Sequence, residues 1–208
     1  MQNSQSIIKY IAELYRLSDC RDPLARRVHL PHAYSTLNYA RLLYGTQLPD
    51  SLAIASFAHD RDRIFEADFV KKSDFSPTLD GVRKYKQTTA HKGAKLLRKD
   101  LKGLLPAGMV DDITYLVEHH ELGGERNNEI LLDKPDSTKT YNLNYGADVL
   151  READALSFFD FLPLYLQHRG KEETNVKMKY SFERLGSKGL TVLYQQHPNL
   201  ASRLEYAQ

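Results

Sequence analysis

The stretch AIASFAHDRDR, residues 53–63, constrains the fold of this chain more than any other feature. Its first six residues are apolar or small, so a helix here would be packed on nearly all sides. His59 and Asp60 follow directly, and a buried imidazole and carboxylate need polar partners. A divalent metal ion would satisfy both, because both side chains are common metal ligands. The simpler alternative is a helix that ends in a solvated His-Asp-Arg-Asp-Arg run.

Composition excludes several classes of protein. The 208 residues, 41% of them hydrophobic, are enough for a sizeable core. The 29 basic and 27 acidic residues are mixed along the chain, so no nucleic-acid polymer is expected as a partner. Cys20 is the only cysteine, which excludes an internal disulfide and a cysteine-built zinc site and makes a reducing cytoplasm the expected location. No window approaches the roughly 18 apolar residues of a membrane span, so no membrane is expected.

Apolar residues recur at helical spacing along most of the chain, which predicts an all-α bundle in a single domain, residues 1–208. The polar segment at about 124–140 is expected to be a surface excursion that could cover a site, and no convincing strand pair is present. Helices are expected over residues 5–17, 32–44, between the turn at 49–50 and His59, over 88–105, 106–123 and 141–170, with two more and a short terminal one in 171–208.

Prolines refine these helices. Pro31 suits the first turn of the helix over 32–44, which would place His32 near its N-terminus. Pro163 is expected to kink the helix over 141–170, whose middle contains Asp154. His91 is expected near the start of the helix over 88–105.

Six of the eight histidines fall between residues 29 and 120, most of them at the ends of expected helices, where a bundle could bring them together. The order His32, then His59-Asp60, then Asp154 resembles the HD-domain superfamily of metal-dependent phosphohydrolases, which are helical bundles. The separation of 59 − 32 = 27 positions also matches that family. The resemblance implies that these four residues bind a metal ion. We interpret His29, His168 and His197 as structural.

Two further motifs resemble the HD proteins that hold two metal ions, including the HD-GYP cyclic dinucleotide phosphodiesterases. They are AHKGAKLL around His91 and VEHHE around His119 and His120. The likeness covers a core of about residues 29–160, with the helices of 171–208 packed on it. It implies two divalent ions, drawn from Fe, Mn, Ni, Zn or Mg, with these histidines as added ligands; the sequence leaves open which of His119 and His120 ligates.

Two departures from the family pattern affect the expected substrate. HDRDR replaces the common HD-x-G-K, which leaves Arg63 where a substrate-facing lysine usually stands. No Gly-Tyr-Pro follows HHE, so specificity for cyclic di-GMP is not supported. Gly93 would let its helix approach the site closely, or is simply tolerated in a helix. Lys177, Lys179 and Arg184 would suit an anionic substrate, or form an ordinary charged helix face.

The resemblance implies a metal-dependent phosphohydrolase or phosphodiesterase that acts on a nucleotide or another small phosphoester. A hydroxide bridging the two metals would be the nucleophile, with Asp60 as the bridging carboxylate and Arg63 as a contact to phosphate. Two alternatives remain: a di-iron oxygenase similar to inositol oxygenase, and a non-catalytic metal- or nucleotide-binding module. The sequence does not indicate the oligomeric state.

Overall fold

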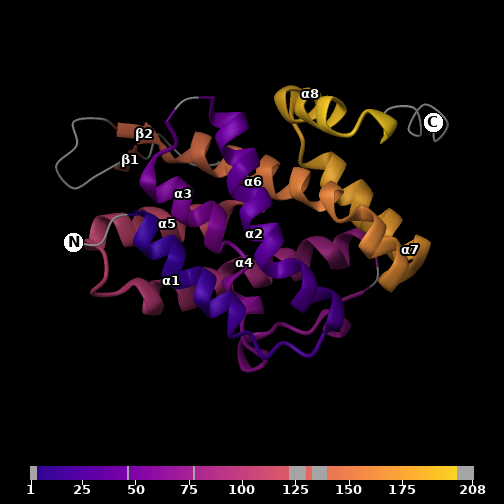
Figure 1. Ribbon diagram of the computed structural model, residues 1–208, viewed down its shortest axis with the longest axis horizontal. Coiled ribbons are helices and arrows are strands. Elements are labelled where there is room, and N and C mark those ends of the chain that lie inside the picture. The colour runs from indigo at the N-terminus through magenta and orange to yellow at the C-terminus, as the bar shows by residue number, and fades with distance from the viewer. Residues whose placement is uncertain (1–3, 46, 77, 122–129, 133–139, 201–208) are drawn as a thin grey trace.

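A computed structural model describes residues 4–45, 47–76, 78–121, 130–132 and 140–200. Within these ranges the chain is almost entirely helical, which confirms the all-α prediction (Figure 1). Three short 3₁₀-helices follow α3, over Arg61–Arg63, Glu66–Asp68 and Lys72–Asp74. The α-helices are α1 (Ser4–Arg16), α2 (Pro23–Tyr44), α3 (Asp50–Ala58), α4 (Leu79–Leu101), α5 (Ala107–His119), α6 (Leu143–Asp160), α7 (Leu162–Glu183) and α8 (Ser187–Gln196).

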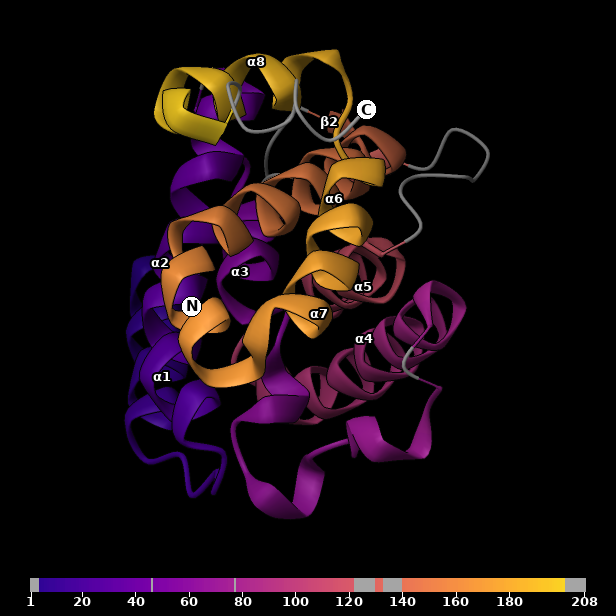
Figure 2. The same cartoon turned by 90° about the vertical axis from the view of Figure 1, so that its right-hand side faces the viewer.

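Helix α3 lies at the centre of the bundle. It contacts α1 and α2 on one side and α5 and α6 on the other, an arrangement that Figure 2 shows from the side. Its residues 51–58 are all buried, as the apolar run predicts. The two most extensive helix pairs, α2 with α6 and α4 with α5, flank it. The residues that follow α3 therefore emerge inside the protein.

The HDRDR run is buried rather than solvated. His59, Asp60, Arg61 and Asp62 each expose 6% of their surface or less. Arg61 pairs with Asp100 of α4 and lies 3.2 Å from Asp68, so its charge is neutralised locally. The simpler alternative of a solvated end to α3 is thus wrong.

Helix α2 begins nine residues before its expected start at residue 32. The Oδ1 atom of Asp22 accepts hydrogen bonds from the backbone N–H groups of Leu24 (2.9 Å) and Ala25 (3.2 Å), and Pro23 occupies the first turn. Pro31 then lies inside the helix, where it cannot donate a backbone hydrogen bond. His32 is consequently in the middle of α2, not at its N-terminus.

Helix α4 also starts earlier than expected. The hydroxyl of Thr78 caps it by accepting a hydrogen bond from Gly81 N at 3.2 Å. His91 is therefore near the middle of the helix. The segment over 141–170 forms two helices rather than one kinked helix, because α6 ends at Asp160 and Pro163 lies in the first turn of α7.

Two three-residue strands form an antiparallel pair that the sequence does not indicate. Strand β1 (Ile130–Leu132) pairs with β2 (Thr140–Asn142), with Leu131 opposite Tyr141. Three residues are too few to show the alternation of a strand. The remainder of the expected excursion, at 124–129 and 133–139, lies outside the described residues.

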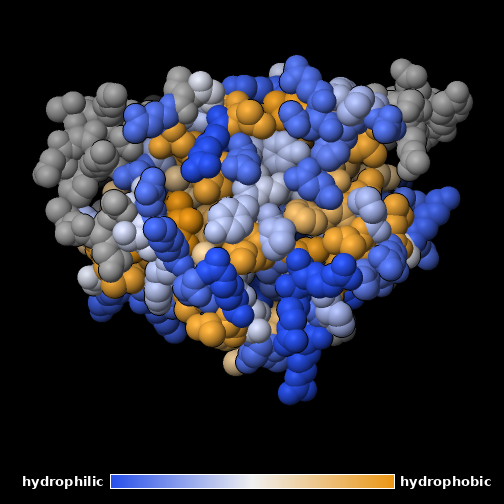
Figure 3. Space-filling view, in the orientation of Figure 1, coloured by the Kyte–Doolittle hydropathy of each residue, from blue (hydrophilic) through white to orange (hydrophobic). Residues whose placement is uncertain are grey.

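The surface of this bundle carries apolar areas broken up by hydrophilic side chains on the face that Figure 3 shows. Among the described residues, no helix combines the length and the apolar character that crossing a membrane requires.

Phe57 tests the central position of α3. Its ring is fully buried and packs edge-on against Tyr15 and Tyr34, with centroids 6.0 and 4.9 Å away. Phe57→Ala should lower the free energy of unfolding by about 3–5 kcal/mol, because it leaves a cavity in the core. Leu17→Ala, at a side chain that is 69% exposed, should change it by less than about 0.5 kcal/mol. Urea unfolding in chelator measures both, and a loss below about 1 kcal/mol in Phe57→Ala would contradict the packing.

Candidate metal centre

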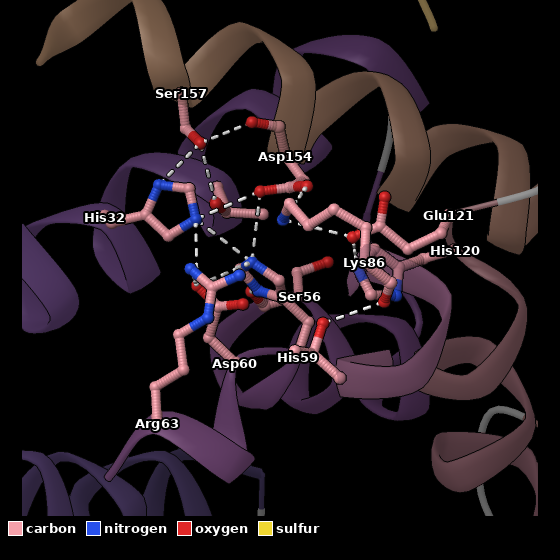
Figure 4. Close-up of polar contacts among 12 residues, drawn as sticks. His32, Ser56, His59, Asp60, Arg63, Lys86, His120, Glu121, Asp154 and Ser157 are labelled. Carbon is pink, nitrogen blue, oxygen red and sulfur yellow. Dashed lines mark hydrogen bonds and ion pairs between the residues drawn. The ribbon is translucent and has the colours of Figure 1, made fainter. Parts of the chain in front are cut away.

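The four residues of the HD-like pattern converge at one point in the protein (Figure 4). His32 comes from α2, His59 and Asp60 follow α3, and Asp154 comes from α6. The Nε2 atoms of the two histidines are 3.1 Å apart, and Asp154 Oδ1 lies 3.0 Å from the first and 3.2 Å from the second. Asp60 Oδ2 is 3.5 and 3.7 Å from these nitrogens. Ligands bound at ~2.1 Å to one ion lie roughly 3.0–3.4 Å apart, so the separations among His32, His59 and Asp154 fit a common ion, and Asp60 lies slightly farther away.

Hydrogen bonding determines which nitrogen of His59 faces this point. Its Nδ1 atom lies 3.0 Å from the carbonyl oxygen of Ser56. A carbonyl only accepts hydrogen bonds, so the Nδ1 atom must carry a proton and donate it. The Nε2 atom of the neutral ring then has a lone pair directed at Asp154.

A longer chain of hydrogen bonds does the same for His32. The hydroxyl of Ser157 donates its single proton to the backbone carbonyl of Asp154 at 2.7 Å and accepts a hydrogen bond from Thr36 at 3.1 Å. Its remaining lone pair must accept from the Nδ1 atom of His32, 2.9 Å away. The Nε2 atom of His32 is therefore also unprotonated in the neutral ring.

With both rings neutral, the four groups are electron-pair donors with no proton between them. Both carboxylates are ionised: burial acts to raise the pKa of Asp60, but the positive charges of Arg63 and Lys86 hold it well below its usual range. Burial is likewise outweighed at Asp154, whose pKa is lowered by Lys86 and Arg184. Asp60 Oδ2 is ion-paired with Arg63 Nη1 at 3.0 Å, but no donor among the described residues reaches it with hydrogen-bond geometry. A proton on one imidazole satisfies one acceptor, whereas a metal ion satisfies all four groups, so these residues fit a divalent ion.

A second set of possible ligands lies beside the first. His120, Glu121 and Asp154 each offer an atom within 4.8 Å of the others. The Nδ1 atom of His120 donates to Val117 O at 2.6 Å, which leaves its Nε2 atom 3.2 Å from Glu121 Oε1 and without a hydrogen bond. This set resembles a second metal site in its donor atoms.

Two side-chain cations already lie against the carboxylates of this second set. The Nζ atom of Lys86 is 3.1 Å from Glu121 Oε1 and 3.7 Å from Asp154 Oδ2. The guanidinium of Arg184 lies 2.7 Å from Asp154 Oδ2 and 3.2 Å from Glu121 Oε2. These contacts hold the pKa of Glu121 well below its usual range, although burial alone would raise it. The negative charge that would attract a second ion is thus largely neutralised.

The structure does not bring His91 or His119 to this cluster. His91 is on the outer face of α4, where its side chain is 54% exposed and its Nδ1 atom lies 2.7 Å from Glu118 Oε1. The ring of His119 stacks on Tyr115, with centroids 4.3 Å apart. Gly93 does face the site, because a Cβ atom there would lie 3.3 Å from the carbonyl oxygen of His59. Of the added histidines, only His120 points inward, and its ring centroid is 5.3 Å from that of His59.

A cavity of about 830 Å³ adjoins the ligand cluster. His32 and Asp60 form part of its wall, together with Arg63, whose Nη1 atom lies 3.0 Å from Asp60 Oδ2. The rest of the wall includes aromatic and basic side chains. These are Phe69, Phe75, Tyr85, Lys86, Tyr165 and Lys177.

Several residues of this site were not predicted from the sequence. Lys86 and Glu121 lie in the buried ion pairs, and Ser157 orients His32. Lys86 did carry a signal, since it shares the buried face of α4 with Ala90, Gly93 and Leu97 at helical spacing. A lysine on an apolar face needs a buried partner, and that partner is Glu121.

No protein-family model, no curated protein and no solved structure matches this chain. The likeness to HD-domain proteins therefore remains a prediction that rests on the residues themselves.

His29, in the cavity wall, makes the stability of the fold depend on pH. Burial, and then the charge of Arg63, lowers its pKa to about 4. The unfolded chain, with a pKa of ~6.5, therefore binds a proton first as the pH falls. Stability is unaffected above pH ~6.5 and should decrease by about 3 kcal/mol by pH ~4.

His29→Gln removes this titration, so it should lose about 3 kcal/mol less than the parent between pH 7 and pH 4. Urea unfolding at both pH values, in chelator, measures the difference. Equal losses of folding stability in the two proteins would show that His29 is not held neutral by burial.

Proposed function

We propose that this protein is a metal-dependent phosphohydrolase that acts on a small phosphoester, with one divalent ion bound by His32, His59, Asp60 and Asp154. The observation that carries the proposal is the convergence of donor atoms of His32, His59 and Asp154, with Asp60 beside them, at the wall of a cavity whose lining includes basic side chains. Histidine and carboxylate ligands beside a substrate-sized space are typical of catalytic rather than structural metal sites. Reaction at a phosphoryl group suits the cations, which would stabilise its developing negative charge.

The proposal includes one ion rather than two. Lys86 and Arg184 supply two positive charges to Glu121 and to the outer oxygen of Asp154. A second ion at the donors of His120 would have to displace them or lie beside them, with repulsion in a buried site. Lys86 and Arg184 supply the positive charge that a second metal ion would otherwise provide.

The bound ion would supply Lewis acidity and lower the pKa of a water molecule. The chain's own residues then have distinct roles. Arg63 holds Asp60 ionised and offers its remaining N–H groups to phosphoryl oxygens. Its Nε atom is buried and has no hydrogen-bond partner among the described residues. Lys86, 3.7 Å from Asp154, adds positive charge at the same wall.

The di-iron oxygenase alternative is less well supported. It requires a second iron, and the cations beside Glu121 oppose one. The non-catalytic alternative is also less well supported. A purely structural ion needs neither an adjoining cavity nor basic side chains with unused N–H groups in the cavity wall.

Activity provides the first test. The purified protein, loaded with Mn²⁺, Fe²⁺, Ni²⁺, Zn²⁺ or Mg²⁺, should hydrolyse at least one member of a panel of phosphomonoesters, cyclic nucleotides and dinucleoside polyphosphates. Chelation should abolish the activity and the same metal should restore it. Asp60→Asn, which keeps the side-chain volume, should lower kcat/KM by more than about tenfold, or ~1.4 kcal/mol. Oxygen consumption by an iron-loaded protein without hydrolysis would instead favour the oxygenase.

Metal content provides the second test. The parent protein should bind one equivalent of metal per chain after dialysis, as measured by mass spectrometry of the elements. His32→Ala should lower this value severalfold, because it removes one of the four proposed metal ligands. His91→Ala, at an exposed position on α4, should retain the full equivalent. Two equivalents in the parent that fall to one in His91→Ala would refute the single-ion proposal.

A further inference from the structure

Lys177 on α7 is a basic side chain without an anionic partner in the cavity wall. Among the described residues, no carboxylate forms an ion pair with it, although it is half-buried in the cavity wall. Its Nζ atom donates to the hydroxyl of Tyr165 at 2.7 Å and lies over the rings of Tyr165 (3.9 Å) and Phe158 (4.9 Å). An ammonium group has three N–H donors, so two remain for a ligand.

Tyr165 extends the same donor surface. Its hydroxyl oxygen accepts the hydrogen bond from Lys177, and its own proton has no acceptor among the described residues. Burial raises the pKa of Tyr165, so the group stays protonated and can donate. The pair of Lys177 and Tyr165, which we call the Lys-Tyr pair, therefore presents only donors to the cavity, and donors suit an anion.

The charges around the cavity indicate how negative that anion is. Three carboxylates, Asp60, Asp154 and Glu121, are matched by three cations, Arg63, Lys86 and Arg184. A divalent ion and a charged Lys177 would add three positive charges. Asp62, whose pKa burial raises to about 7, would subtract at most one. Elsewhere in the wall, Asp22, Glu172 and Glu173 outnumber Lys72 and Arg169 by one, so the excess is one or two positive charges. Lys177 is the basic side chain of this set without a carboxylate partner, so the second negative charge of a phosphate dianion would pair with it, and a singly charged diester lacks that charge.

The protonation of Lys177 agrees with this balance. Burial, followed by the charges of Lys86 and Arg63, lowers its pKa well below the usual range. The positive surroundings that disfavour its charged form in the free protein are those that a bound dianion would neutralise.

We propose that the Lys-Tyr pair is an anion subsite that binds the phosphoryl group of a phosphomonoester and makes the enzyme prefer monoesters to diesters. The substrate preference rests on the proposed function, whereas the binding of a phosphate dianion does not. Lys177 contributes the charge and Tyr165 a further hydrogen bond.

Inorganic phosphate is the direct probe, measured by isothermal titration calorimetry on the metal-loaded protein. Lys177→Met keeps the side-chain length over the two rings but removes the charge, and should weaken phosphate binding by about tenfold or more. Tyr165→Phe keeps the ring and should weaken it by about threefold or more. Lys179→Met, at an exposed lysine on the same helix, is the matched control and should bind as the parent does.

Steady-state kinetics test the preference with p-nitrophenyl phosphate and bis-p-nitrophenyl phosphate. Lys177→Met should lower kcat/KM for the monoester by about tenfold and for the diester by less than about threefold. An equal loss on both esters, or phosphate binding as tight as in the parent, would overturn the subsite. Should Lys177→Met unfold, as judged by circular dichroism, normal phosphate binding by Tyr165→Phe would overturn it.

The two proposals fail in different ways. A parent protein that binds phosphate through Lys177 but hydrolyses neither ester would retain the subsite and refute the phosphohydrolase. A parent protein that hydrolyses esters while Lys177→Met behaves like Lys179→Met would retain the phosphohydrolase and refute the subsite.

Discussion

The orientation of two imidazole rings is the constraint on which the whole site depends. Each ring uses its Nδ1 proton inside the protein, His59 on the carbonyl of Ser56 and His32 on the hydroxyl of Ser157. Ser157 is in turn held by the backbone of Asp154 and by Thr36, so the extensive packing of α2 on α6 determines the tautomer of His32. The ligand set is thus organised before any ion binds, and the cost of ordering it is part of the folding energy.

Such a set places many charges in the protein interior, and each is expensive unless it is paired. In the structure each buried charge lies beside a charge of opposite sign. Arg63 pairs with Asp60, and Lys86 and Arg184 lie between Asp154 and Glu121. Asp154 faces the two histidines with one oxygen and the cations with the other. The same carboxylate therefore joins the metal ligands to the ion-pair network, and loss of one cation would alter the charge at the ligands.

The parts of this arrangement that the sequence predicts are those with a local signal. An apolar run that ends in His59-Asp60 predicts a buried pair, and the spacing to His32 and Asp154 follows a known order. The starts of α2 and α4 were not predicted correctly, because their capping residues, Asp22 and Thr78, lie in stretches that resemble loops. His91 could not be placed correctly without the true helix phase, which directs Lys86 and Gly93 inward and His91 outward. The pairing of Lys86 with Glu121 depends on how α4 packs against α5, and no local pattern encodes it.

The break in α7 links this fold to the second wall of the cavity. Tyr165 and Lys177 are 12 residues apart, a distance of about 18 Å along a straight helix, yet their polar atoms are 2.7 Å apart. The chain must therefore turn back between them, and it does so at Gly170, whose backbone is left-handed with φ of 76° (Figure 2). A residue with a side chain rarely adopts that conformation. One glycine thus allows the second half of α7 to return across the cavity and to bring Lys177, and beyond it Arg184, to face residues from α2, α4 and α6.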